Sequence, residues 1–140
     1  MLAEEYLISI KVCRHSVISI KFTLDDFKKF QKSKNVRVIK DKNCIAILVL
    51  TDIEIEIYFI GVARSCRGKG LGKKLLKSII SFSKSYGASV IILEVGVKNV
   101  PAKKIYLSSD FKECGVRKDY YKNKSGFRQD AVIMKLNLET

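Results

Sequence analysis

The 140-residue chain contains no tryptophan, one proline and one histidine, and it has no long apolar run. A helix that crosses a membrane needs about 18 or more apolar residues in succession, so no membrane partner is expected. The start of the chain includes Glu4 and Glu5 and lacks the basic segment of a secretory signal. Apolar residues make up 47% of the sequence, enough for the core of one domain over residues 1–140. We therefore expect a single-domain cytoplasmic protein.

Metal-binding and redox motifs are also absent. No two cysteines form a C-x-x-C pair, which argues against a zinc knuckle or a redox dithiol. The four cysteines are Cys13, Cys44, Cys66 and Cys114. A histidine-rich metal site or a Ser-His-Asp triad would have to depend on His15 alone. We predict reduced, mostly buried thiols, a structural histidine and no metal ion.

The residues present in excess are basic. The chain carries 27 Lys and Arg against 14 Asp and Glu, a net charge of +13. Residues 1–60 hold ten basic and eight acidic side chains, whereas residues 61–140 hold seventeen and six. Such a surplus reflects either general solubility or attraction to nucleic acid, an acidic surface or a phosphate-bearing ligand. Charge alone leaves both interpretations open.

The first half of the chain predicts short strands and one clear helix. Alternating apolar and polar residues, or apolar runs between turn residues, mark the strands. Acidic residues in a T-L-D-D run mark the helix start. The expected elements are a strand at 6–12, a strand or short helix at 14–22, a helix beginning at Thr23, strands at 36–39 and Cys44–Leu50 around a turn at 41–43, and a strand at 53–59. This order favours antiparallel pairing.

The second half alternates helices and strands. A Gly-rich basic loop at 67–72 opens a helix that Gly87 ends. The apolar run 88–95 predicts a strand buried on both faces, and Asn99 with Pro101 marks another helix start. Strands at 111–116 and 131–138, joined by a polar loop, follow. We predict an α/β fold with a mixed, mostly antiparallel sheet of about seven strands, flanking helices and one parallel strand–helix–strand unit.

The loop at 67–72, R-G-K-G-L-G, is the strongest local signal. Its three glycines allow a tight backbone, and the first N–H groups of the next helix lack partners within that helix. No acidic residue lies between Ile57 and Leu93, a stretch with seven basic residues. These features predict a site for an anion such as pyrophosphate. Neither a Walker loop nor a dinucleotide-binding fingerprint fits the residue order, and a Gly-rich turn without a ligand is the alternative.

Two side chains are candidates for acid–base chemistry. Glu94 is the only carboxylate between Glu56 and Asp110, in an apolar strand where an unpaired ionised group would cost several kcal/mol. We interpret it as a general base, with an ion-paired structural glutamate as the alternative. Tyr106 follows on a predicted helix, and its phenol can donate a proton toward the cleft beside the Glu94 strand. On its own, an aromatic residue at helical spacing usually belongs to the core.

In these residues the chain resembles the GNAT (Gcn5-related) N-acetyltransferases. Residues 67–72 match that family's acetyl-coenzyme A motif, Gln/Arg-x-x-Gly-x-Gly/Ala, between a strand and a helix. A narrower similarity to RimI-type enzymes, which acetylate the N-terminal alanine of a ribosomal protein, rests on L-E-V at 93–95, Asn99, Ile105-Tyr106, Phe111, R-K-D-Y-Y at 117–121 and D-A-V-I-M at 130–134. The resemblance implies a GNAT fold and a metal-free N-acetyltransferase that uses acetyl-CoA.

The resemblance also implies roles for individual residues. Glu94 would take the proton of the incoming ammonium through water, and Tyr106 would protonate the departing thiolate. The Val62 N–H would polarise the thioester carbonyl. Tyr120 and Tyr121 would line the peptide entrance. The residues that would hold acetyl-CoA are Ile60, Gly61, Val62, Arg67, Gly68, Lys69, Gly70, Leu71, Gly72, Lys73, Asn99 and Tyr106.

The acceptor stays open at this point. Residues 1–43 match the family weakly and help to shape the acceptor site, so a polyamine, an antibiotic amine and aminoacyl-tRNA are alternative acceptors. Basic residues outside the loop favour an acceptor presented with RNA, such as a protein N-terminus on the ribosome. A non-enzymatic nucleic-acid binder is less well supported, because it leaves Glu94 unexplained. We expect a monomer or a weak dimer.

Overall fold

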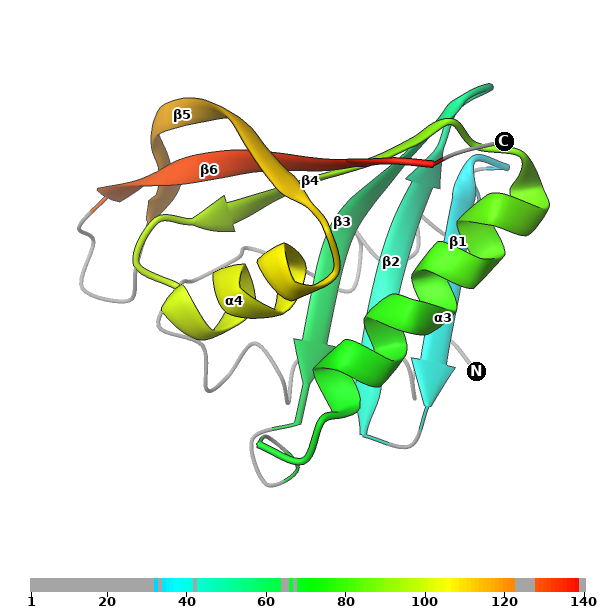
Figure 1. The fold of residues 1–140 in the computed structure, drawn as a ribbon, viewed down its shortest axis with the longest axis horizontal. Helices are drawn as coiled ribbons and strands as arrows, with labels where there is room; N and C mark the ends of the chain where they lie inside the picture. Colours follow the sequence, from blue (N-terminus) through cyan, green and yellow to red (C-terminus); the bar gives the residue numbers. More distant parts are fainter. Residues whose placement is uncertain are drawn as a thin grey trace.

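The computed structural model describes residues 32, 34–41, 43–63, 66, 68–122 and 128–138. These residues form one six-stranded sheet with two helices packed against it (Figure 1). The elements predicted at 6–12 and 14–22, the helix from Thr23, and the predictions for Cys13 and His15 lie outside the described residues.

The described elements confirm the predicted α/β class. The helices are α3 (Leu71–Tyr86) and α4 (Val100–Ser108). The sheet has the order β1-β2-β3-β4-β6-β5, in which β3 and β4 pair in parallel and every other neighbouring pair is antiparallel. Six strands are described, where about seven were expected. They are β1 (Val36–Asp41), β2 (Cys44–Leu50), β3 (Glu54–Val62), β4 (Val90–Gly96), β5 (Lys112–Lys122) and β6 (Arg128–Asn137).

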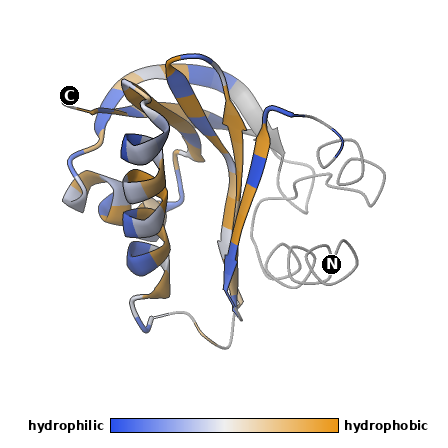
Figure 2. Ribbon diagram, turned by 90° about the vertical axis from the view of Figure 1, so that its right-hand side faces the viewer, coloured by the Kyte–Doolittle hydropathy of each residue, from blue (hydrophilic) through white to orange (hydrophobic). Residues whose placement is uncertain are grey.

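The two faces of the sheet differ in chemistry. Both helices contribute to an apolar core on one face, which we call the helical face; Leu76, Leu93 and Met134 are fully buried in it. Figure 2 shows α3 standing against the sheet with apolar residues between them. Successive residues of a strand point to opposite faces, so Glu56 and Glu94 lie on the other face. We call this second face the carboxylate face.

A β-bulge in β3 changes which of its residues face the helices. The register with β2 passes from Leu48↔Ile57 to Ile47↔Phe59, so Tyr58 is the extra residue. Ile57 therefore packs in the helical-face core, whereas Phe59 is buried outside that cluster. Beyond the bulge the alternation is shifted by one residue, and Ile60 packs against the helical-face core.

Both helices begin where the sequence predicts, and α3 also ends where it predicts. Gly87 ends α3 with a φ of 92°, a left-handed conformation that favours glycine. Asn99 caps α4 by accepting a hydrogen bond from the Ala102 N–H at 3.3 Å. Asp110 follows α4 with a φ of 71°, a left-handed conformation that has a higher free energy for an L-residue than for glycine. The Phe111 N–H closes this turn on the Tyr106 carbonyl at 3.1 Å.

Three predictions need correction. The strand predicted to be buried on both faces, β4, is only half-buried at the carboxylate-face positions Ile92 and Glu94. The polar loop before β6 is shorter than expected, because β5 extends through Tyr120 and Tyr121 and pairs with β6 as far as Lys122 and Arg128. The thiols are not mostly buried among the described cysteines: Cys44 is buried, Cys66 is partly exposed and Cys114 is exposed.

Candidate active site

The parallel pair β3–β4 comes apart halfway along its length. The Cα register between the two strands ends at Ile57 and Leu93. Beyond these residues β3 stays beside β2 and β4 stays beside β6, so the two strands diverge (Figure 1). We call the opening between residues 58–62 of β3 and 94–96 of β4 the wedge. An extended ligand can pair with a strand edge that opens in this way.

The Gly-rich loop joins the end of β3 to the start of α3. Gly68 and Gly70 have φ values of 78° and 79°, which glycine adopts without strain. Gly70 is the N-cap of α3, no side chain caps the helix, and its first turn has no acidic residue. The first N–H groups of a helix are therefore available to an anion, with Lys69 and Lys73 exposed beside them. Arg67 lies outside the described residues.

Three elements meet around Gly72, in the first turn of α3. A methyl group at this position would lie 3.5 Å from Ile105 Cδ1 of α4 and 3.8 Å from Val62 Cγ2 of β3. The start of α3, the middle of α4 and the end of β3 thus converge on the helical side of the wedge. The structure brings together the predicted cofactor residues at 60–62 and 68–73.

Glu94 lies on the carboxylate face, one residue beyond the end of the β3–β4 register. Its side chain is 18% exposed, and its Oε1 lies 3.2 Å from Nη2 of Arg117 on β5. Burial raises the pKa of Glu56 on the neighbouring strand, and the charges of Glu94 and Glu54 raise it further, while Arg117 lowers it. The ion pair agrees with the structural alternative for Glu94. Its role as a base stays a prediction.

Tyr106 lies on the opposite side of β4 from Glu94. Its side chain is 6% exposed, its ring centroid is 5.7 Å from that of Phe111, and it belongs to the helical-face core together with Leu93 and Val95. Burial raises the pKa of the Tyr106 hydroxyl, which therefore stays a neutral proton donor at physiological pH. The sequence predicted both side chains beside one cleft. They lie instead on opposite sides of β4.

The remaining predicted site residues are less informative. Asn99 is exposed and uses its side-chain oxygen to cap α4, while its amide nitrogen takes no part in that bond. Tyr120 and Tyr121 have their backbone in β5. The predicted contacts of these three residues with cofactor or peptide stay predictions.

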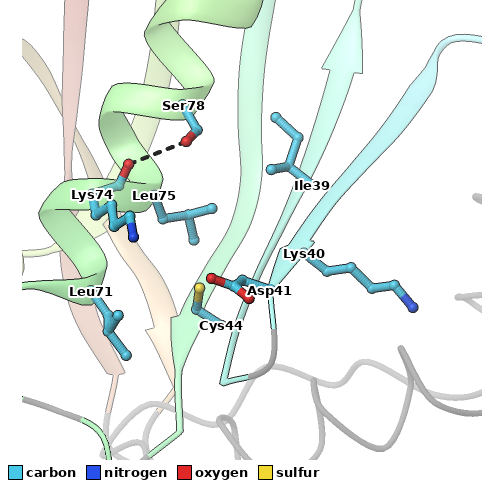
Figure 3. A pocket seen from close by; sticks show the side chains of 8 residues that line it. All are labelled: Ile39, Lys40, Asp41, Cys44, Leu71, Lys74, Leu75 and Ser78. Atoms are coloured by element: carbon cyan, nitrogen blue, oxygen red, sulfur yellow. Dashed lines mark hydrogen bonds between the residues drawn. The ribbon is translucent and has the colours of Figure 1, made fainter.

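A pocket lies between the first half of α3 and the β1–β2 hairpin, away from the wedge (Figure 3). Burial raises the pKa of the Cys44 thiol and the charge of Asp41 raises it further, so this thiol is not activated as a nucleophile. Leu71 is the one predicted site residue in the lining. The lining residues are Ile39, Lys40, Asp41, Cys44, Leu71, Lys74, Leu75 and Ser78.

The described residues hold neither a cluster of metal ligands nor a membrane-spanning helix. Within the described part of the chain, no group of three or more His, Cys, Asp or Glu side chains is placed to hold a metal ion. None of the described helices is long and apolar enough to cross a bilayer.

Sequence reasoning missed Arg117 and Glu56 as members of the site. The R-K-D-Y-Y run at 117–121 supports the family resemblance but does not indicate what Arg117 contacts, since that contact depends on strand pairing. Glu56 is foreseeable only as a residue on the wetter side of its strand. What places both beside Glu94 is the order β3-β4-β6-β5.

Known proteins resemble this chain in sequence and in fold. A model of the acetyltransferase (GNAT) family matches residues 13–111. The ribosomal protein bS18 alanine N-acetyltransferase of Haemophilus ducreyi is 33% identical over 109 residues, covering 76% of this chain and 75% of that protein. The crystal structure of the ribosomal-protein-S18-alanine N-acetyltransferase of Escherichia coli superposes with a TM-score of 0.86 at 26% identity, covering 99% and 88%. An acetyltransferase of Salmonella typhimurium with its cofactor acetyl-CoA has a TM-score of 0.76 at 18% identity, covering 100% and 91%.

Proposed function

Because this chain belongs to the GNAT family and is an N-acetyltransferase, we propose that it moves the acetyl group of acetyl-CoA to the N-terminal α-amine of a ribosomal protein. The relatives named for this reaction support alanine as the acceptor's first residue. The Salmonella structure with acetyl-CoA, which shares the fold, supports the donor.

The residues around the wedge fit the two ends of the donor. Backbone N–H groups from residues 67–73 would hold its pyrophosphate at the start of α3, as helix N-termini hold phosphates in other folds. The edge of β3 at 60–62 would pair with the extended pantetheine arm, and the Val62 N–H would polarise the thioester carbonyl. The Asn99 amide would contact the same arm. The loop thus anchors the phosphates while the strand edge directs the arm into the wedge.

The acid and the base would serve the reaction from opposite sides of β4. Bound acetyl-CoA supplies an acetyl group activated as a thioester, and the transfer forms an amide C–N bond and breaks the C–S bond. Glu94 would accept the proton of the acceptor ammonium through water, which leaves a neutral amine to attack. Tyr106 would give its phenolic proton to the departing sulfur, and the second proton that the nitrogen loses on forming the amide would return to Tyr106 through water. Tyr120 and Tyr121 would line the entrance for the peptide.

The observation that carries this proposal is the end of the β3–β4 ladder. It opens the sheet beside Glu94 on one face and near the core that holds Tyr106 on the other. The same opening adjoins the Gly-rich loop through Val62 and Gly72. In the proposed function, the anion site, the strand edge, the acid and the base would share this one opening.

Acetyl transfer to a panel of amines tests the acceptor. The panel contains a peptide that begins with alanine, the same peptide with a blocked N-terminus, spermidine and an aminoacyl-tRNA. We expect transfer to the free peptide, one CoA released per acetyl group, and none to the blocked peptide. Transfer confined to spermidine or aminoacyl-tRNA would overturn the proposed acceptor.

Thermal unfolding tests the donor separately. Acetyl-CoA at a hundred times its dissociation constant is expected to raise the free energy of unfolding by about 2.7 kcal/mol. An unchanged unfolding temperature at saturating acetyl-CoA would contradict the donor site.

The charge of α3 favours an acceptor presented beside RNA. Its solvent-exposed positions include Lys73, Lys74, Lys77 and Lys84, and the helix contains no acidic residue. Such a surface attracts phosphates, and the attraction weakens as salt rises. We expect faster acetylation on a ribosomal subunit than on the free peptide, with a difference that shrinks with ionic strength. If the free peptide reacts at low salt as fast as the ribosomal subunit does, this part of the proposal is wrong.

A further inference from the structure

Arg117 reaches Glu94 across an intervening strand. Arg117 on β5 pairs with Ala131 on β6, and Ala131 in turn pairs with Gly96 on β4. Glu94 lies two residues before Gly96 on the same face of β4. Because Ala131 and Gly96 have small or absent side chains, the guanidinium can lie over β6 and come within 3.2 Å of the Glu94 carboxylate.

This ion pair lies among other charges on the carboxylate face. Glu56 and Glu54 approach from β3, and Glu56 interacts electrostatically with both Glu94 and Arg117. Lys135 of β6 is exposed and pairs in register with Ile92, two residues before Glu94. Of these described groups, Arg117 is the one whose contact with the Glu94 oxygen is within ion-pair distance. A cation there offsets the repulsion between two neighbouring carboxylates.

We propose that Arg117 is a positioning residue for the reaction, which fixes the Glu94 carboxylate through their ion pair so that this carboxylate can accept the proton of the acceptor. This inference rests on the proposed function, because it assigns Glu94 the role of base. Arg117 does not touch the acetyl donor in this scheme. It acts through the geometry and the charge of Glu94.

If the Arg117–Glu94 ion pair only joined β5 to β4 and had no part in the reaction, a different result is expected. Losing such a structural ion pair lowers stability and reduces the rate by the same factor at every pH. Losing a positioning cation makes the ionised form of the base less favourable, so the defect is largest in acid and diminishes as pH rises. The pH dependence of the rate therefore separates the two roles.

The experiment compares Arg117→Gln, Arg117→Lys and Lys118→Gln in the full chain. Lys118 is exposed on the same strand next to Arg117, so it controls for the loss of one positive charge. We expect Arg117→Gln to lower kcat/KM by up to about tenfold at the acidic end of the profile, as a shift of the acidic limb by up to one pH unit requires, and by a decreasing factor as pH rises. Arg117→Lys restores most of the rate, and Lys118→Gln keeps the wild-type profile. The dissociation constant of acetyl-CoA is unchanged in all three.

A second measurement does not depend on turnover. In protein with ¹³C-labelled glutamate at one fixed pH, the Glu94 carboxyl signal, assigned with Glu94→Gln, should move in Arg117→Gln and keep its wild-type position in Lys118→Gln. An unchanged Glu94 signal in Arg117→Gln, or a kcat/KM profile of Arg117→Gln that parallels the wild type at all pH values, would overturn the inference. A wild-type protein that acetylates none of the panel amines would instead overturn the proposed function, and the carboxyl signal would still report whether Arg117 contacts Glu94.

Discussion

Strand β5 contributes to two ion pairs on opposite faces of the sheet, and they are nearly alike in geometry. On the helical face, Glu113 lies 3.1 Å from Lys103 of α4, with side chains 50% and 23% exposed. On the carboxylate face, Arg117 lies 3.2 Å from Glu94, with side chains 52% and 18% exposed. The first pair joins the sheet edge to a helix, whereas the second ends at the central strand beside the wedge. Distance and exposure alone therefore do not distinguish a structural ion pair from one at a reaction site.

A similar contrast holds between the parts of the two faces that lie around Glu94 and Tyr106. On the helical face, apolar side chains from both helices and the sheet form the core, and a buried phenol is its main polar group near the wedge. On the carboxylate face, Glu56, Glu94 and Arg117 remain in partial contact with water and with one another. One face can thus keep the Tyr106 hydroxyl neutral, while the other keeps its carboxylates within reach of water and of a cation.

The largest expected effect comes from removing the base on the carboxylate face. Glu94→Gln keeps the shape of the side chain but cannot accept a proton, so kcat should fall by about a thousandfold, within the range for general base catalysis. Binding of acetyl-CoA, measured by calorimetry, should be unchanged. Glu54→Gln on the same face, at the paired end of β3, is the matched control and should keep most of the activity. Equal losses in the two variants would contradict a special role for Glu94.

Removing the acid on the helical face should cost less. Tyr106→Phe keeps the ring that packs on Phe111, so the unfolding temperature should change little. We expect kcat to fall about a hundredfold, at the low end of acid catalysis, because a thiolate is a good leaving group that can depart before it is fully protonated. Since burial raises the pKa of Tyr106, the wild-type hydroxyl keeps its proton as pH rises toward the ordinary value of about 10. If kcat of the wild type falls above about pH 8 and this fall is absent in Tyr106→Phe, the assignment of Tyr106 as the acid is contradicted.

A smaller effect is expected at the Gly-rich loop that joins β3 to α3. Gly70→Ala places a side chain at a φ of 79°, which should cost about 1–2 kcal/mol of stability and weaken acetyl-CoA binding several-fold. Gly72→Ala is the matched control for stability alone, because its methyl group would make ordinary contacts at 3.5 and 3.8 Å and alanine favours a helix. Chemical denaturation and calorimetry on both variants test this difference. Equal stability of the two variants would show that the left-handed turn at Gly70 is not required.

The smallest effect is expected for the ion pair on the helical face. Glu113→Gln should lower stability by less than about 1 kcal/mol, as for other exposed ion pairs, and leave the pH profile of kcat/KM unchanged. Comparing Glu113→Gln with Arg117→Gln tests the two ion pairs of strand β5 against each other. A pH-dependent loss of activity in Glu113→Gln would remove the distinction between the faces.

Much of the fold was predictable because it depends on local patterns. The β1–β2 hairpin, the limits of α3 and the start of α4 follow from turn residues, glycine and the Asn99 cap, all of which act within a few residues. The extension of β5 through Tyr120 and Tyr121 was not predictable in this way. It depends on pairing with β6, whose partner positions lie beyond a loop.

For the candidate site, sequence alone indicated Glu94, Tyr106 and the Gly-rich loop, since a lone carboxylate in an apolar run and three glycines before a helix are local features. The tertiary structure decided that Glu94 and Tyr106 lie on opposite faces of β4, that the β3–β4 ladder ends at Leu93, and that Arg117 meets Glu94. Periodicity determines which residues of one strand share a face. Which strand lies beside it, and where two strands part, depends on register between segments far apart in the chain, and that register forms only when the whole sheet packs against its helices.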